Sequence, residues 1–359
     1  MLVLELRKGF FVFNDYWCNF DTIFLGKQVY CVRLTLQGGM FMGKYVLKRI
    51  VLMIFTLFII MTMCFFAIKA LPFEVRAGAG EDGEKLKMIA EQRGYYDPVI
   101  EQYGRYLVRL FKGDWGVGIN MEQNADVWDT FMKRLPPTML LNMWTMIISI
   151  PAGLGLGIYA ALKKNKWQDH FISTGVMVFI SVPSYVYAFL VQYFLCFKLG
   201  LPLTVSSLHD AGGSYFSWIM IKSMIAPVLS MSFGTIAGFA RYTRAELTEV
   251  LTSEFMLLAR TKGLTRGQAT LRHALRNAMV PIFPMILGQF IGIISGSLII
   301  EAMFGVPGVG GLSLQAIQVL DYDFFMMTTV FYTFIGLAAG IIVDISYGFI
   351  DPRIRMGAR

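Results

Sequence analysis

The run IVLMIFTLFIIMTMCFFAI, residues Ile50–Ile68, decides the fold of this chain. It contains no charged side chain, and a helix of about 20 mostly apolar residues is long enough to cross the hydrocarbon core of a bilayer. In lipid the run has to be helical, because an isolated strand would leave its backbone N–H and C=O groups without partners. The chain is therefore expected to be an integral membrane protein.

Five further stretches have the same apolar character, and each is long enough for a span or nearly so. They are Pro136–Leu162, Phe171–Phe197, Ser223–Ala240 (extended by Ser217–Ile221 past Lys222), Asn277–Ile300 and Phe324–Val343. The sequence therefore predicts an all-α membrane protein with about six transmembrane helices.

The composition agrees with this class. Hydrophobic residues make up 56% of the chain and charged residues 16%, whereas soluble proteins have about 45–50% and 25%. In such a chain the formal net charge of +8 concerns which side of the membrane the basic residues face, and no nucleic-acid partner is expected.

The cysteines lack metal-ligand spacing and are interpreted as small apolar fillers; they are Cys18, Cys31, Cys64 and Cys196.

Basic residues collect in alternate connections, which predicts the orientation, because Lys and Arg accumulate on the cytoplasmic side. They precede the first span, lie between the second and third and between the fourth and fifth spans, and follow the sixth; examples are Lys44, Lys48, Arg49, Lys163, Lys164, Lys166, Arg241, Arg272, Arg353 and Arg355. The opposite side offers Lys198 in one loop and Asp321 with Asp323 in another. Both termini are therefore expected in the cytoplasm, with the protein in the cytoplasmic membrane.

We expect six segments along the chain. An atypical extension covers residues 1–41, where translation could instead begin at Met40 or Met42. The first transmembrane helix covers 42–70, and an extracytoplasmic segment, with a short amphipathic helix within Tyr95–Phe111, covers 71–134. A core of five spans covers 135–350 and includes a basic loop at 241–280, and a cytoplasmic tail covers 351–359.

The loop between the fourth and fifth spans is the most patterned part of the chain. Gly263 suits a helix C-terminal cap, and Thr265 with Gln268 matches a capping box that opens a new helix. After it, an apolar stripe runs along one face; its members are Leu271, Ala274, Leu275, Ala278 and Met279. The pattern predicts helix, tight turn, helix at the membrane surface. The segment could be a docking site for a cytoplasmic partner or an amphipathic loop that only anchors the fold. A DNA-binding helix-turn-helix is disfavoured, because transmembrane helices hold both ends of the segment close to the membrane.

Three motifs of this loop resemble the segment that defines permease subunits of binding-protein-dependent ABC importers, in the peptide and nickel branch. They are ARYTR at Ala240–Arg244, ARTKGL at Ala259–Leu264 and HALRNAMVP at His273–Pro281. Further landmarks agree over residues 42–355; they are Gly113–Gly116, Arg134–Pro136, Glu301, Phe304, Pro307, Gly308, Gly310 and Asp351–Arg355. One departure is that Leu257-Leu258-Ala259 stands where the wider superfamily has Glu-Ala-Ala, which puts in doubt which side chain makes the main contact to the ATPase.

The resemblance implies an importer-permease bundle with a cytoplasmic coupling helix. It implies a pair of ABC ATPase subunits, a second permease subunit and an extracytoplasmic solute-binding protein as partners, besides membrane lipid. The ATPase-coupling residues would be Glu254, Ala259, Arg260, Lys262, Gly263 and Leu264. The implied cargo is short peptides, with nickel or another small solute as the alternative.

No catalytic role is expected for this subunit. The sequence has no phosphate-binding Gly-x-x-x-x-Gly-Lys-Ser/Thr motif and no metal-ligand pattern among its three histidines, so no cofactor is expected and ATP hydrolysis would belong to the partners. A secondary transporter is the rival from another class. It is disfavoured because Lys222 is the one ionisable residue expected near mid-bilayer.

Within the spans, small and polar residues suggest packing and a path. Glycine ridges are expected at Gly288, Gly292 and Gly296 and at Gly153, Gly155 and Gly157, and Pro183, Pro227 and Pro284 are expected to kink their helices. The polar residues Asn142, Ser184, Gln192 and Gln289 are candidates for a translocation path, with interhelical hydrogen bonds as the alternative for each.

Overall fold

The computed structural model describes residues 10–13, 16–19, 31–72, 74–75 and 81–350. They fall into two compact units, one of Thr56–Val343 and one of Met1–Phe55 with Asp344–Arg359. The second unit includes an antiparallel strand pair, β1 (Phe10–Phe13) and β2 (Tyr16–Asn19), and an ion pair of 3.1 Å between Arg49 and Asp344. The C-terminal motif Asp351–Arg355 and the tail 351–359 lie outside the described residues.

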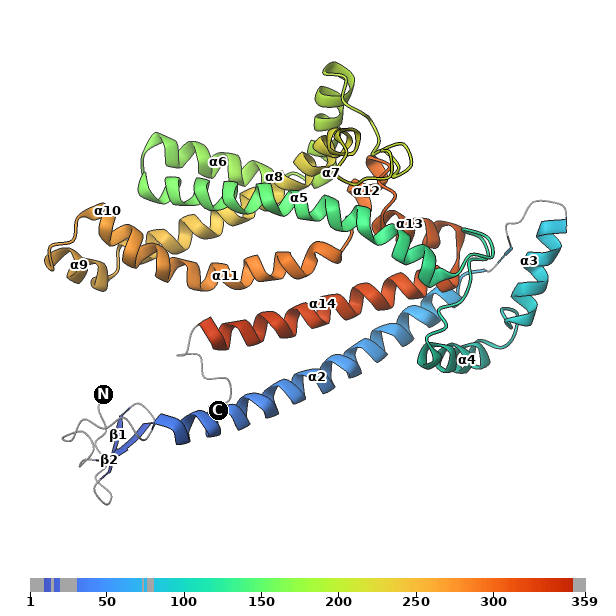
Figure 1. Ribbon diagram of the computed structural model, residues 1–359, viewed down its shortest axis with the longest axis horizontal. Coiled ribbons are helices and arrows are strands. Elements are labelled where there is room, and N and C mark those ends of the chain that lie inside the picture. The colour runs from blue at the N-terminus through green and yellow to red at the C-terminus, as the bar shows by residue number, and fades with distance from the viewer. Residues whose placement is uncertain (1–9, 14–15, 20–30, 73, 76–80, 351–359) are drawn as a thin grey trace. The chain divides into compact units, whose positions relative to one another are not determined.

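The prediction of an all-α membrane protein is confirmed. Within the described residues, five helices are long and apolar enough to cross a membrane, and a bent pair of helices makes a sixth if it counts as one span. The straight spans lie in α2 (Cys31–Lys69), α5 (Val127–Leu162), α8 (Trp218–Leu251), α11 (Leu275–Ile291) and α14 (Tyr322–Ile350). Figure 1 shows α5, α8 and α11 running alongside one another.

The third predicted span is bent rather than straight. It consists of α6 (Trp167–Ser181), α7 (Ser184–Val191) and the π-helix η1 (Gln192–Lys198), with an angle of 104° at the break. Val182 is extended, with φ −85° and ψ 129°, because the ring of Pro183 disfavours the helical conformation of the residue before it. The kink expected at Pro183 is therefore present, as a sharp break between α6 and α7.

The fifth predicted span ends earlier than expected, so its extent to Ile300 is wrong. After α11 the chain makes one 3-10 turn, η3 (Gly292–Ile294), leaves the helix at Ser295 and resumes as α12 (Leu298–Met303) and α13 (Val309–Val319). The expected glycine ridge on this span is also wrong. A Cβ on Gly292 would meet nothing within 4 Å, and Gly296 lies outside the helix.

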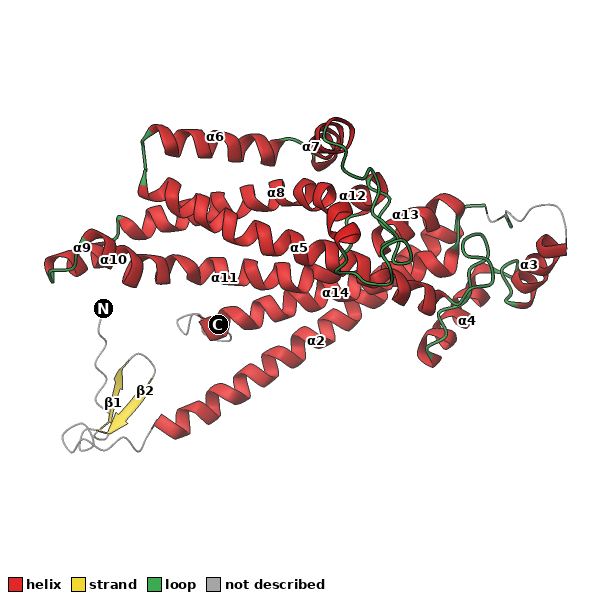
Figure 2. Cartoon of the chain, turned by 45° about the horizontal axis from the view of Figure 1, so that its top comes forward, coloured by secondary structure: helices red, strands yellow, loops and turns green. Residues whose placement is uncertain are grey.

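The glycines that bring two helices together are instead those of α5. A Cβ on Gly153 would lie 2.6 Å from Phe239 Cβ, and one on Gly157 would lie 2.6 Å from Thr243 Cβ and 2.7 Å from the Ala240 carbonyl oxygen. Gly155, on the other side of the helix, faces open space. Two of the three predicted glycines therefore form a close seam between α5 and α8, which Figure 2 shows side by side.

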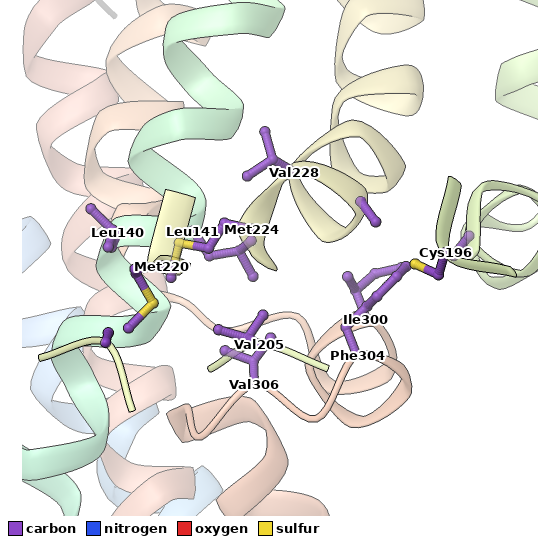
Figure 3. Close-up of a cluster of buried hydrophobic side chains, with 13 residues drawn as sticks. Leu140, Leu141, Cys196, Val205, Met220, Met224, Val228, Ile300, Phe304 and Val306 are labelled. Atoms are coloured by element: carbon purple, nitrogen blue, oxygen red, sulfur yellow. The ribbon is translucent and has the colours of Figure 1, made fainter. Parts of the chain in front are cut away.

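A buried apolar cluster joins α5, α8 and α12 at one end of this seam (Figure 3). Leu141, Met220, Ile300 and Phe304 are each at most 2% exposed. The carbonyl of Phe304 also accepts a hydrogen bond of 2.9 Å from the Val205 N–H. The irregular segment after α11 is thus packed into the bundle by α12.

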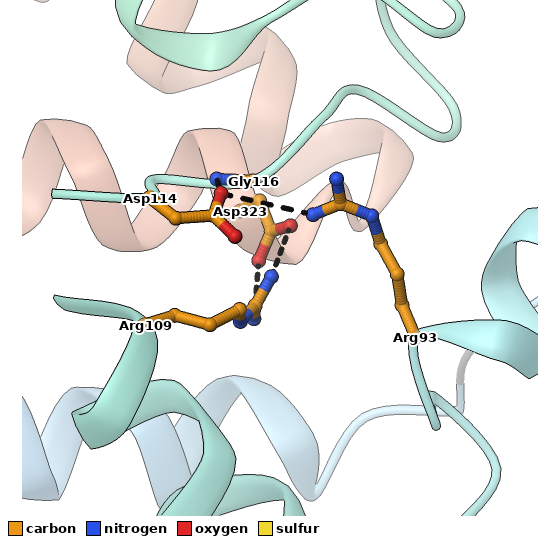
Figure 4. Close-up of polar contacts among 5 residues, drawn as sticks. All are labelled: Arg93, Arg109, Asp114, Gly116 and Asp323. Carbon is orange, nitrogen blue, oxygen red and sulfur yellow. Dashed lines mark hydrogen bonds and ion pairs between the residues drawn. The ribbon is translucent and has the colours of Figure 1, made fainter. Parts of the chain in front are cut away.

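The segment between α2 and α5 folds into two helices, α3 (Glu81–Gln92) and α4 (Val99–Lys112). The amphipathic helix expected within Tyr95–Phe111 is therefore present, beginning at Val99. Arg109 of α4 forms an ion pair with Asp323 at the start of α14, with 3.3 Å from each guanidinium nitrogen to a carboxylate oxygen (Figure 4). Burial lowers the pKa of Arg109, but the Asp323 carboxylate outweighs it and raises the pKa above its usual value.

Asp321 secures the loop that follows α4. Its buried Oδ2 accepts hydrogen bonds from the backbone N–H groups of Ile119, Asn120 and Met121 at 2.8–3.0 Å. Nearby, Gly116 passes so close to Asp323 that a Cβ there would overlap the carboxylate. The two aspartates, expected only as loop charges, therefore hold this segment to the end of α14.

The glycine seam leads to a direct test. Gly157→Ala should lower the free energy of unfolding by about 1–3 kcal/mol, because the added methyl group overpacks the contact with Thr243 and Ala240. Thermal inactivation in mild detergent, followed by size-exclusion chromatography, measures this. Gly155→Ala is the matched control and should be neutral or slightly stabilising, since alanine favours the helix. Equal effects of the two substitutions would contradict the seam.

Candidate functional site

The connection between α8 and α11 forms a helical turn at one end of the bundle, the end opposite to α12 and α13 (Figure 1). It contains α9 (Glu254–Thr261), α10 (Arg266–Ala269) and the π-helix η2 (Thr270–Ala274). Gly263 has φ +88°, a left-handed conformation that glycine adopts without strain. Thr265 caps α10 in a complete capping box with Gln268. The predicted order of helix, tight turn and helix is confirmed.

Small side chains attach this turn to the bundle. Met256 and Ala259 of α9 are buried against Leu247 of α8, together with Ala269 and Ala274. Leu264 is half-buried against the same cluster. Contacts at positions three residues apart keep one face of α9 on the bundle, so its other face points away from it.

The predicted coupling residues therefore divide into two groups. Glu254, Arg260, Lys262 and Gly263 are exposed, whereas Ala259 and Leu264 hold the turn in place. The exposed face also carries two large apolar side chains that the prediction left out, Leu257 at 60% and Leu258 at 56% exposure. Met256 and Ala259 are three residues apart and so share one face of α9. With that face on the bundle, the helical spacing turns Leu257 and Leu258 outward.

The expected apolar stripe after the turn is wrong at one position. Leu271 is 71% exposed, and Ala269 is fully buried instead. The reason is η2, because a π-helical turn takes an extra residue and so shifts the inward face from Leu271 to the pair Ala269 and Ala274. Ala278 stays buried as expected.

Arg244, the last residue of the ARYTR motif, ties α8 to α6. Its guanidinium donates to both oxygens of Asp169, at 2.9 Å from Nη2 to Oδ2. Asp169 is 1% exposed and also accepts from the Asn165 N–H at 2.9 Å. Removing the partner of a buried, hydrogen-bonded carboxylate is strongly destabilising, so this ion pair fastens the first turn of α6 to α8.

Two of the four residues considered for a translocation path bind backbone carbonyl groups of other segments. Asn142 donates to the carbonyl oxygens of Ile293 and Ser295 at 2.8 and 2.7 Å, and Gln192 donates to that of Met303 at 3.3 Å. Both amides bind backbone at irregular segments, which is the interhelical alternative. Ser184 is half-buried at the first turn of α7, and Gln289 is exposed on α11.

A buried carboxylate organises the segment after α11. Glu301 is fully buried and accepts hydrogen bonds from Thr138 Oγ1 at 3.1 Å and from the Gly310 N–H at 2.8 Å. The N–H groups of Ser297 and Gly311 complete the set, at 3.2 and 3.3 Å. Burial raises the pKa of Glu301, and the hydrogen bonds oppose that rise.

This carboxylate acts as a remote cap for α13. The first N–H groups of a helix lack partners within it and attract negative charge, and here Glu301 and Thr138 supply the acceptors; the Val309 N–H donates to Thr138 at 2.9 Å. The glycines around it leave room for this approach, since a Cβ on Gly308 would lie 2.4 Å from Glu301. From the sequence, Glu301 was recognised only as a landmark of the family resemblance. Its signal was a lone acidic residue between an apolar run and a glycine-rich one.

These features define a multi-span membrane protein with an exposed helical turn at one end of its bundle. Residues 153–356 match the family model described as "Binding-protein-dependent transport system inner membrane component", and residues 42–142 match the model of the N-terminal part of such membrane components. The chain belongs to this family of binding-protein-dependent transport permeases.

Relatives cover nearly the whole chain. The dipeptide transport system permease protein DppB of Lactococcus lactis is 31% identical over 88% of this chain and 100% of its own length. The protein of the same name from Bacillus subtilis is 32% identical over 88% of this chain and 99% of its own length. The glutathione transport system permease protein GsiC of Escherichia coli is 30% identical over the same shares.

Glu301→Ala should lower the free energy of unfolding by about 3 kcal/mol or more, because it leaves several buried donors without an acceptor. Glu301→Gln should cost less, since the amide oxygen still accepts. Thermal inactivation in detergent measures both, with the exposed Gln315→Ala as control. Equal stability of Glu301→Ala and the control would contradict the capping role.

Arg244→Ala should cost about 2–3 kcal/mol, because Asp169 stays buried without its counter-charge. The matched control is Arg241→Ala in the same motif, whose side chain is exposed; it should change stability by less than about 0.5 kcal/mol. The same thermal assay decides, and a loss of similar size in both variants would refute the role of the ion pair.

Proposed function

We propose that this chain is the permease subunit of an ABC importer that moves short peptides across the cytoplasmic membrane. Family membership supports the transport role, and the dipeptide and glutathione permeases among its relatives favour peptides over nickel. The ATP is hydrolysed by partner ATPase subunits. A second permease subunit and an extracytoplasmic solute-binding protein complete the transporter, with both termini of this chain in the cytoplasm.

The observation that carries the proposal is the turn around Gly263. Its buried face joins α8 and α11 through Met256, Ala259 and Ala274. Its other face is exposed in the part of the chain that the structure describes. A partner that grips the exposed face therefore acts on two spans at once. The pair Arg244 and Asp169 adds α6 to the moving group.

The chemistry of the exposed face indicates the partner's surface. Leu257 and Leu258 lie outward together with Glu254 at the first turn of α9. In this chain they occupy the positions of the Glu-Ala that the wider superfamily carries. The ATPase is therefore proposed to offer a mainly apolar groove with a hydrogen-bond donor or a cation for Glu254.

The mechanism is a shift between two arrangements of the bundle. ATP binding closes the ATPase pair and moves the docked turn. α8 transmits this movement, since it is one helix from Trp218 to Leu251 and includes both the span and the approach to the turn. The spans then change between inward-open and outward-open forms, with Ser184 and Gln289 as candidate path residues and with Asn142 holding the break after α11.

Leu258→Asp tests the docking face. The variant should insert and purify normally, because Leu258 is exposed, but should recover at least tenfold less ATPase on affinity purification, since a charge would enter an apolar contact. Mass spectrometry and ATPase activity of the purified complex measure this. The control is Leu208→Asp, in the exposed loop between η1 and α8, which should retain the ATPase.

Full ATPase recovery and peptide transport by Leu258→Asp would reject this face as the docking site. A chain that purifies without any ATPase, even after crosslinking at Lys262, would reject the importer assignment itself.

A further inference from the structure

Helix α4 has three distinct sectors around its axis. Successive residues of a helix lie about 100° apart, so the buried Tyr106 and the half-buried Tyr103, Leu107 and Leu110 form one sector, which packs on the bundle. The next sector is apolar but exposed, with Ile100 at 80%, Val108 at 55% and Phe111 at 89%. The remaining exposed sector is charged and holds Glu101, Arg105 and Lys112.

The contacts of Tyr103 set the depth of this helix relative to α2. Its hydroxyl lies 2.6 Å from Thr62 Oγ1, and its ring lies 5.2 Å from that of Phe65 and 5.3 Å from that of Phe66. The candidate span in α2 ends at Lys69. Thr62 stands about 10 Å before that end, at 1.5 Å per residue. α4 therefore lies beside the last two turns of a membrane span, not beyond it.

The exposed apolar sector of α4 continues an exposed apolar surface of α2. Met63 and Phe66 are exposed on α2, inside the candidate span, at a height where acyl chains surround a membrane protein. The Phe66 ring touches Tyr103, whereas the buried Phe65 touches both Tyr103 and Tyr106. Tyr103 is therefore on the lipid side of the contact, and Ile100, Phe111 and Val108 follow it around the helix.

We propose that α4 is an interfacial helix that binds the lipid bilayer itself. Ile100, Val108 and Phe111 enter the boundary between head groups and acyl chains, and Glu101, Arg105 and Lys112 face water. A helix with an apolar face buried about 5–10 Å into the boundary between head groups and acyl chains, and with a charged face turned to water, is typical of this binding mode. Tyr103 and Tyr106 lie at the depth where tyrosines collect in membrane proteins.

One ion pair links α4, and so its contact with lipid, to the helices of the bundle. Arg109 lies on the same helix and binds Asp323 at the beginning of α14. The bilayer thus holds the end of α14 at a fixed depth by way of α4. A protein partner covering the same apolar sector is the competing occupant, and the experiment below separates the two.

The test uses nitroxide labels on the full chain reconstituted in lipid nanodiscs, alone and in the assembled transporter, with the four native cysteines replaced. Labels at Val108→Cys and Phe111→Cys should collide with oxygen several times more than with a water-soluble nickel chelate. The label at Arg105→Cys, on the charged sector of the same helix, is the matched control and should show the reverse order.

Two results would overturn the proposal. Strong collision with the nickel chelate at all three sites would place α4 in water. Protection of the Val108 and Phe111 sites from both reagents in the assembled transporter would show that protein covers this sector. The labels replace exposed side chains, and elution of each labelled chain at the unlabelled position on size exclusion verifies its fold.

Discussion

The structure depends on one constraint: in lipid, every backbone N–H and C=O group released by a broken helix needs a partner within the protein. The chain breaks helices at Val182 and again after Ile294. At the second break the Asn142 amide takes two of the freed carbonyl groups, and Glu301 takes N–H groups of the segment that follows. The irregular segment after α11 is thus integrated into the bundle, and α5 provides one of its partners through Asn142.

The sequence predicted the features that local chemistry determines. The spans follow from apolar runs, and the turn at Gly263 and the cap at Thr265 follow from backbone preferences that neighbouring residues express. Pro183 predicted a kink in the third span, but the break between Ile291 and Ile300 escaped prediction because hydropathy is the same for a straight and a broken helix. The partner of the second break, Asn142, stands 151 residues from Ile293, so no local pattern reveals it.

The candidate site shows the same limit. Its glycine and capping residues could be identified from the sequence, but the outward direction of Leu257 and Leu258 depends on which side of α9 packs on Leu247. Leu271 was wrongly predicted to face the bundle because a π-helical turn has no clear sequence signal. Such a turn rotates the residues before it to another side of the helix. The buried role of Glu301 needs Thr138 from α5 and glycines from a later segment, a combination that only the tertiary structure assembles.

The glycine seam between α5 and α8 also constrains how the protein is made. Ribosomes add about 5–20 residues per second, so α8 follows the end of α5 at Leu162 only several seconds later, after the whole of α6 and α7 has been synthesised. During that interval Gly153 and Gly157 lack the helix that covers them. α5 therefore stays without its α8 partner, within the insertion machinery or in lipid, until α8 is made and closes the glycine seam.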